Sequence, residues 1–75
     1  MKHYIIKTWE MGEDKPRFAA AFTDKQEAED EFISRANRIL YEGAVIDHIT
    51  HRWNYHFKRQ DGTQFKLYMY EDSNI

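Results

Sequence analysis

The sequence has no cysteine, one proline and three glycines among its 75 residues. Without cysteine there is no disulfide framework, no thiolate ligand for a structural zinc ion and no thiol nucleophile. No glycine-rich phosphate loop follows an expected strand. A chain of this size forms one domain, residues 1–75, and hides only about 60% of its unfolded surface. Its stability must therefore come from its aromatic residues or from a partner subunit.

Long hydrophobic runs are also absent. No apolar stretch approaches the ~20 residues that a membrane-spanning helix needs. The first residues are too short and too interrupted by polar side chains to form a signal peptide. Together with the lack of cysteine, this predicts a soluble, cytoplasmic protein with no membrane partner.

The strongest local signal is a β-hairpin in residues 48–70, where two stretches rich in aromatic and β-branched residues flank an Asp61-Gly62 pair. A two-residue loop would put the apolar rows of the two strands on opposite sides of the sheet. A three-residue loop with Gly62 in the left-handed conformation instead sets Arg59 opposite Thr63 and puts both rows on one side. We predict the three-residue loop.

In this register one side of the hairpin is a continuous apolar floor of three cross-strand pairs, Phe57 with Phe65, Tyr55 with Leu67 and Trp53 with Met69. The other side is cationic and carries two phenols, with Arg52 expected opposite Tyr70. We take its side chains as candidate binding residues: Arg52, Asn54, His56, Lys58, Lys66, Tyr68 and Tyr70.

The remainder of the chain predicts two strands and a helix. Residues 2–10 are apolar on both faces of a strand, which favours a central place in the sheet, and residues 17–22 form a shorter strand. A helix is expected to begin at a capping box formed by Thr23 and Gln26 and to end at a left-handed Gly43. Five apolar residues recur at helical spacing and should pack on the sheet: Ala28, Phe32, Ala36, Ile39 and Leu40.

The expected architecture is α+β with the order β-β-α-β-β, one helix on one face of a four-stranded antiparallel sheet that includes a long C-terminal hairpin. As a single strand, residues 48–59 would span ~40 Å, whereas the helix covers only ~27 Å. We therefore expect either a bend near Asn54 or a hairpin that projects beyond the helix. On such a strand His48 and His56 lie roughly 26 Å apart.

Neither a metal site nor an enzyme is predicted. Histidines at that separation cannot close around an ion, and no cofactor motif is present. Ser34 falls within the helix and Ser73 in the tail, which gives no support to a serine nucleophile. A chain this short also lacks the mass to enclose a substrate pocket.

Charge is divided along the chain, although the net formal charge is only −2. Residues 48–70 hold four Lys or Arg against one acid, and the rest of the chain holds seven against twelve. We predict a non-catalytic protein that docks through the aromatic and basic sheet face onto a protein partner, which includes a second copy of the chain. It would act as a modulator or an adaptor.

Two alternatives remain open. The same face could bind nucleic acid, with Tyr68 and Tyr70 stacking on bases and Arg52, Lys58 and Lys66 contacting phosphates. The second alternative makes the acidic front of the helix the contact, imitating a row of phosphates to inhibit a nucleic-acid enzyme, and includes an origin in a phage or mobile element. Its residues are Asp24, Glu27, Asp30 and Glu31.

Overall fold

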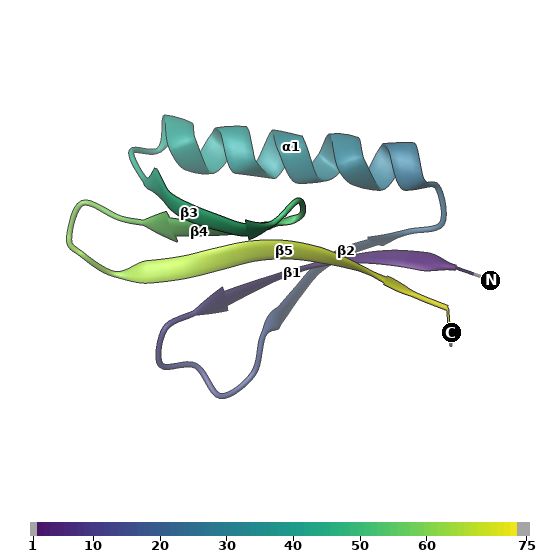
Figure 1. Cartoon of the computed structure of the whole chain (residues 1–75), viewed down its shortest axis with the longest axis horizontal. Helices are drawn as coiled ribbons and strands as arrows, with labels where there is room; N and C mark the ends of the chain where they lie inside the picture. Colours follow the sequence, from purple (N-terminus) through teal and green to yellow (C-terminus); the bar gives the residue numbers. More distant parts are fainter. Residues whose placement is uncertain (1, 74–75) are drawn as a thin grey trace.

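In the computed structural model, which describes residues 2–73, one helix packs on one face of a five-stranded antiparallel sheet (Figure 1). The strands are β1 (His3–Glu10), β2 (Arg17–Phe22), β3 (Val45–His51), β4 (Asn54–Lys58) and β5 (Gln64–Asp72), and the helix is α1 (Lys25–Tyr41). Their order across the sheet is β2-β1-β5-β4-β3. The predicted α+β class with one helix is confirmed, and the predicted number of strands is wrong.

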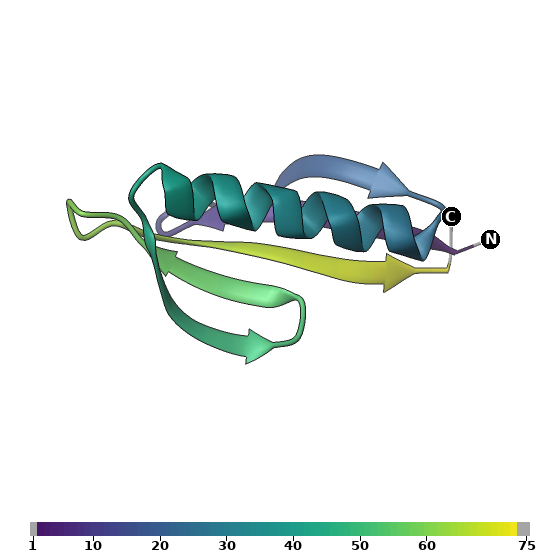
Figure 2. The same ribbon diagram turned by 90° about the horizontal axis from the view of Figure 1, so that it is seen from above.

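The fifth strand arises because residues 48–59 do not form one long strand. The chain turns at Arg52 and Trp53, so β3 folds back and pairs antiparallel with β4. This fold-back replaces the expected long strand by two short ones, and the loop between β4 and β5 still projects beyond the end of α1 (Figures 1 and 2). Two register shifts, next to Ile46 and next to Ile49, make β3 irregular along this pairing.

The hairpin of β4 and β5 has the register that the three-residue loop predicted. Phe57 pairs with Phe65, and the Arg59 amide donates to the Thr63 carbonyl over 2.9 Å. Gly62 has a φ of +90°, in the left-handed region that favours glycine. The Asp61 carboxylate accepts from the Thr63 amide at 2.9 Å, which further fixes the loop.

Strand β1 occupies the central position that its two apolar faces predicted. It lies between β2 and β5, and its pairing with β5 runs over the full length of β1. Ile5 and Ile6 are both buried although they point to opposite sides of the sheet. Because β1 pairs directly with β5, every second side chain of β1 lies on the same face of the sheet as side chains of the β4–β5 hairpin.

The core lies between α1 and the sheet. Of the five residues that the spacing predicted, Ala28, Phe32 and Ala36 are buried. Ile39 is partly buried against the core, and Leu40 is exposed, so the prediction for Leu40 is wrong. Phe32 contacts the rings of Trp53 and Tyr55 edge-to-face, each at a centroid distance of 5.2 Å. Figure 2 shows why the sheet is unequally covered: α1 runs over β1 and β5, and β3 lies to one side with all seven of its residues exposed.

Both ends of α1 have identifiable caps. Asp24 is the N-cap, and its carboxylate accepts from the Gln26 amide at 3.1 Å, so the predicted cap at Thr23 is wrong by one residue. A carboxylate is an equally good N-cap acceptor and adds a favourable interaction with the helix dipole. At the other end, Gly43 has the predicted left-handed φ, +106°. Within the described part of the chain, no helix is long and apolar enough to cross a membrane.

Candidate functional site

The sheet has one side packed against α1 and one side that α1 does not cover, which we call the open face. Strand alternation and the cross-strand pairs place twelve described residues of the three inner strands on it. They are His3, Ile5, Lys7, Trp9, Asn54, His56, Lys58, Gln64, Lys66, Tyr68, Tyr70 and Asp72.

Six of the seven predicted binding residues therefore lie on the open face, and Arg52 does not. Arg52 is in the turn between β3 and β4, where its guanidinium lies 5.3 Å from the centroid of the Trp53 ring. It does not pair with Tyr70, which instead lies opposite Ile5 of β1. The error has the same origin as the missing strand, because the sequence was expected to continue straight through Arg52.

Aromatic and lysine side chains alternate along the centre of the open face. We call this series the aromatic–lysine stripe; it consists of Trp9, Lys66, Tyr68, Lys7 and Tyr70. The Lys66 ammonium lies 5.5 Å from the Trp9 ring centroid and 5.0 Å from that of Tyr68. The Lys7 ammonium lies 5.4 Å from the Tyr70 ring. The two tyrosine rings are stacked at 6.2 Å, so the stripe is continuous.

Lys7 and Trp9 were missed by sequence reasoning because they lie on β1, whose neighbour in the sheet no local pattern identifies. In the structure Lys7 pairs with Tyr68, and Trp9 pairs with Lys66. A signal was nevertheless present. The sequence places apolar residues on both sides of β1. The row that contains Ile5 and Trp9 faces away from the helix, so side chains of neighbouring strands were to be expected beside it.

Protonation of the stripe at neutral pH follows from its contacts. A hydrogen bond to Tyr70 is the largest cause that raises the pKa of Lys7 above its ordinary value, so its ammonium stays charged. Burial raises the pKa of Tyr68, although the charge of Lys7 opposes this. Lys7 therefore offers a charged ammonium group and Tyr68 a neutral phenol, both of which donate hydrogen bonds.

A histidine pair lies beside the stripe. His48 on β3 and His56 on β4 stack with their ring centroids 4.1 Å apart, which corrects the large separation expected for a single strand. The Thr50 hydroxyl lies 3.2 Å from His56 Nε2, and Asp47 forms an ion pair with His48 at 2.8 Å. Burial, followed by the charges of His48 and Lys66, lowers the pKa of His56.

These histidines do not extend into a larger cluster of ligands. Among residues 2–73, no group of three or more His, Cys, Asp or Glu side chains could hold a metal ion. A hollow that touches Trp9, His56 and Lys66 has a volume of about 50 Å³. At the other end of the stripe, Tyr68 and Tyr70 border a larger hollow of about 470 Å³ that also reaches Trp53 and Met69. Ligand pockets usually measure ~300–1,000 Å³, so the part of the open face around Trp9 suits a broad contact better than a small molecule.

The alternative acidic patch lies on α1, but three of its members serve the helix itself. Asp24 is the N-cap, Asp30 accepts from the Gln26 side chain at 2.9 Å, and Glu31 pairs with Arg35 at 2.6 Å. Glu27 lies in the first turn, where a negative charge complements the helix dipole. These local roles account for the acids without a nucleic-acid enzyme as partner.

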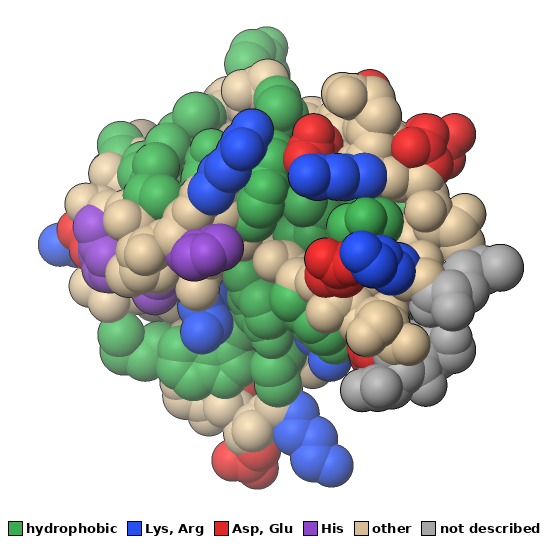
Figure 3. All heavy atoms as spheres, turned by 45° about the vertical axis from the view of Figure 1, so that its right-hand side comes forward, with side chains coloured by type: hydrophobic (Ala, Val, Ile, Leu, Met, Phe, Trp, Pro, Cys, Tyr) green, Lys and Arg blue, Asp and Glu red, His purple; other side chains and the backbone are tan. Residues whose placement is uncertain are grey.

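Apolar side chains are also exposed where α1 approaches the edge strand β3. Ile33 and Leu40 on the helix are 48% and 39% exposed, and Ile46 and Ile49 on the strand are 39% and 52% exposed. Figure 3 shows hydrophobic side chains gathered at the upper left, next to histidines. Both edge strands, β2 and β3, contain register shifts, which disfavour pairing of a sheet edge with a second chain.

Comparison with known proteins adds no relative, because no protein family, curated protein or solved structure matches this chain.

Proposed function

We propose that this protein is a non-catalytic binding module that docks onto a partner protein through the open face. The observation that carries the proposal is the aromatic–lysine stripe on the uncovered side of the two central strands. Trp and Tyr are enriched at the centres of protein interfaces, where their large rings contribute much of the binding energy. The surrounding polar residues of β4 supply the rim that such interfaces have.

The charge on the open face indicates the chemistry of the partner surface. Lys7, Lys58 and Lys66 lie on this face among the described residues, and their acidic neighbours are Asp72 and the Asp47 that binds His48. The face is thus moderately basic, whereas the chain as a whole has a formal charge of −2. A partner surface that presents carboxylates and backbone carbonyls would accept hydrogen bonds from the lysines and the phenols.

The positions of the lysine side chains over the aromatic rings of the stripe favour a protein partner over nucleic acid. Bases stack on free ring faces, but lysine ammonium groups lie near the rings of Trp9, Tyr68 and Tyr70. The acidic helix adds repulsion at long range toward a polyanion. A stacked strand of nucleotides would have to displace the lysines that also contact its phosphates.

Site-specific photo-crosslinking in cells tests the proposal. A benzophenone amino acid replaces Tyr70, which is 37% exposed on the open face, or Tyr41, which is 93% exposed on α1. We expect a discrete protein adduct from position 70 and none at that mass from position 41. Lys7→Gln combined with Lys66→Gln should abolish the adduct, and Lys15→Gln in the exposed loop after β1 should not.

Other results would overturn the proposal. A nuclease-sensitive adduct, or binding of single-stranded oligonucleotides that weakens steeply with salt, would assign the face to nucleic acid. An adduct of twice the chain mass would show that the partner is a second copy of this chain and not a different protein. Equal labelling from positions 70 and 41 would mean that the open face has no special role.

A further inference from the structure

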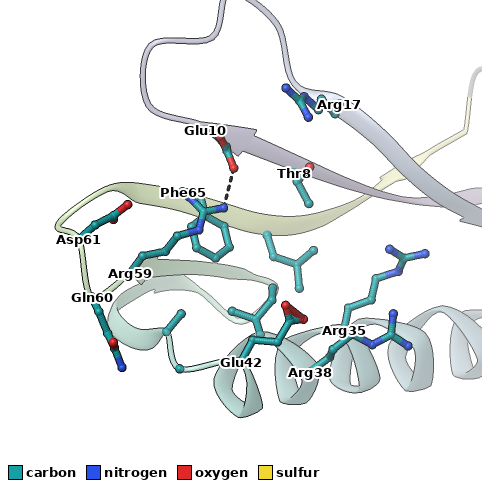
Figure 4. A pocket seen from close by; sticks show the side chains of 14 residues that line it. Thr8, Glu10, Arg17, Arg35, Arg38, Glu42, Arg59, Gln60, Asp61 and Phe65 are labelled. Carbon is teal, nitrogen blue, oxygen red and sulfur yellow. Dashed lines mark hydrogen bonds and ion pairs between the residues drawn. The ribbon is translucent and has the colours of Figure 1, made fainter.

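A large cleft lies on the opposite side of the sheet from the stripe. It has a volume of about 600 Å³ and lies between the second half of α1 and strands β1 and β5, as shown in Figure 4. Four of its lining side chains are arginines: Arg17, Arg35, Arg38 and Arg59. The cleft is large enough for a small organic molecule, since ligand pockets usually measure ~300–1,000 Å³.

The floor of the cleft is apolar. Leu67 and Phe65 on β5 are buried, with 1% and 8% of their surfaces exposed, and Ile39 of α1 faces them. At the end next to the β4–β5 loop, the Arg59 guanidinium lies 4.1 Å from the Phe65 ring centroid and pairs with Glu10 at 2.6 Å. Arg59 and Glu10 therefore neutralise each other and close that end.

The other end of the cleft is cationic. Figure 4 shows Arg17 extending from β2, with Arg35 and Arg38 extending from α1 on the opposite side of Thr8. Arg38 has no ion pair among residues 2–73. Arg35 and Arg38 therefore approach the cleft from α1, and Arg17 approaches it from β2, on the other side of Thr8.

The ion pairs of Arg17 and Arg35 leave most of their donors unused. Arg17 contacts Glu13 at 2.7 Å and Arg35 contacts Glu31 at 2.6 Å, and both contacts use Nε. Their terminal nitrogens have no partner within the described residues. A guanidinium presents five N–H donors in a planar fork that matches carboxylate and phosphate groups.

We propose that this cleft binds a small organic anion, with its phosphate or carboxylate group at Arg35 and Arg38 of α1 and its apolar body on the floor formed by Ile39 and Leu67. The acids at the rim are compatible with this orientation. Asp61 is bonded to Thr63 and Glu10 to Arg59, both at the loop end. Glu42, the C-cap residue of α1, also lines the cleft.

Amide chemical-shift titration of the ¹⁵N-labelled full chain tests the proposal with three probes of similar shape: phenyl phosphate, benzoate and uncharged benzamide. We expect saturable shifts at Thr8, Ile39 and Ala44 with either anion. Binding of benzamide should be at least about tenfold weaker, because it cannot form charge-assisted hydrogen bonds. If only phenyl phosphate saturates, the ligand class narrows to phosphates.

Two arginine variants distinguish the cleft from general attraction of anions. Arg38→Gln should weaken phenyl phosphate binding by about tenfold, the loss expected for one hydrogen bond to a charged group. Arg52→Gln, in the turn of β3 and β4 outside the cleft, should leave it unchanged. The proposal fails if neither anion saturates by about 10 mM, if benzamide binds equally well, or if both variants have the same effect.

Discussion

Replacing Phe32 with alanine should destabilise the protein severely, because Phe32 is the largest of the three side chains that α1 buries against the sheet. The side chain is fully buried and lies 5.2 Å from the ring centroids of both Trp53 and Tyr55. Large-to-small substitutions of buried Phe cost about 3–5 kcal/mol, and the edge-to-face contacts place Phe32 in the upper part of that range. Alanine raises helix propensity by a few tenths of a kcal/mol, too little to compensate.

That loss is large relative to the total free energy of unfolding of a domain of this size. At ~0.05–0.15 kcal/mol per residue, a domain of this length has a free energy of unfolding of roughly 4–11 kcal/mol. Phe32→Ala should therefore remove at least about a third of the free energy of unfolding, and all of it if the wild-type value lies at the low end of this range. Urea denaturation followed by far-UV circular dichroism and tryptophan fluorescence measures the change, and Trp53 reports directly on the packing around Phe32.

Ile33→Ala is the matched control, because Ile33 is the next residue of the same helix and is 48% exposed. We expect it to cost less than about 1 kcal/mol. If Phe32→Ala also costs less than about 1 kcal/mol with an unchanged denaturant slope, α1 does not pack on the sheet through Phe32 and the assignment of the core is wrong.

Three further predictions concern the loop, the helix cap and the histidine pair. Gly62→Ala should lower stability by about 1–2 kcal/mol, because φ is +90° and alanine is strained in that conformation. No steric clash adds to this cost, since an added Cβ would meet no atom within 4 Å. An unchanged urea midpoint would contradict the left-handed loop. Asp24→Ala should cost about 1 kcal/mol and Thr23→Ala clearly less, and the reverse order would restore Thr23 as the cap. Because burial lowers the pKa of His56, its contribution to stability is complete above pH 6.5 and declines as the pH falls from 6.5 toward the folded pKa. Its ring protons should titrate by NMR below 6.5, and His48→Gln should raise that midpoint; an unshifted midpoint would count against coupling of the two rings.

The hairpin of β4 and β5 could be predicted because its determinants are local. Only the loop with a left-handed Gly62 puts Phe57 and Phe65 on the same side, and burying both rings decides between the two registers. The face that Tyr68 and Lys66 share follows directly from that choice. Helix α1 was predictable for a similar reason, since its apolar spacing and Gly43 lie within one segment.

The turn between β3 and β4 could not be predicted in the same way. It is formed at Arg52 and Trp53 without glycine or proline, and no non-glycine residue in the described chain has a positive φ. A turn made from conformations that every residue adopts leaves no compositional signal. Its stabilisation is tertiary: Trp53 packs on Phe32, and the fold-back stacks His48 on His56. Both errors in the predicted site, Arg52 and the separated histidines, follow from this one turn.

Strand β5 relates the two proposed surfaces, because its side chains alternate between them. Phe65 and Leu67 line the cleft, whereas Lys66 and Tyr68 belong to the stripe. Opposite sides of one strand share backbone but no side-chain contacts, so substitutions on the two sides should act independently if the strand itself is unchanged. Lys66→Gln should leave anion binding in the cleft intact, and Arg38→Gln should leave crosslinking from position 70 intact. Each variant is measured in both assays after circular dichroism establishes a native spectrum. Loss of crosslinking in a natively folded Arg38→Gln variant would show that a single partner contacts both sides of the sheet, and the division into two sites would then be wrong.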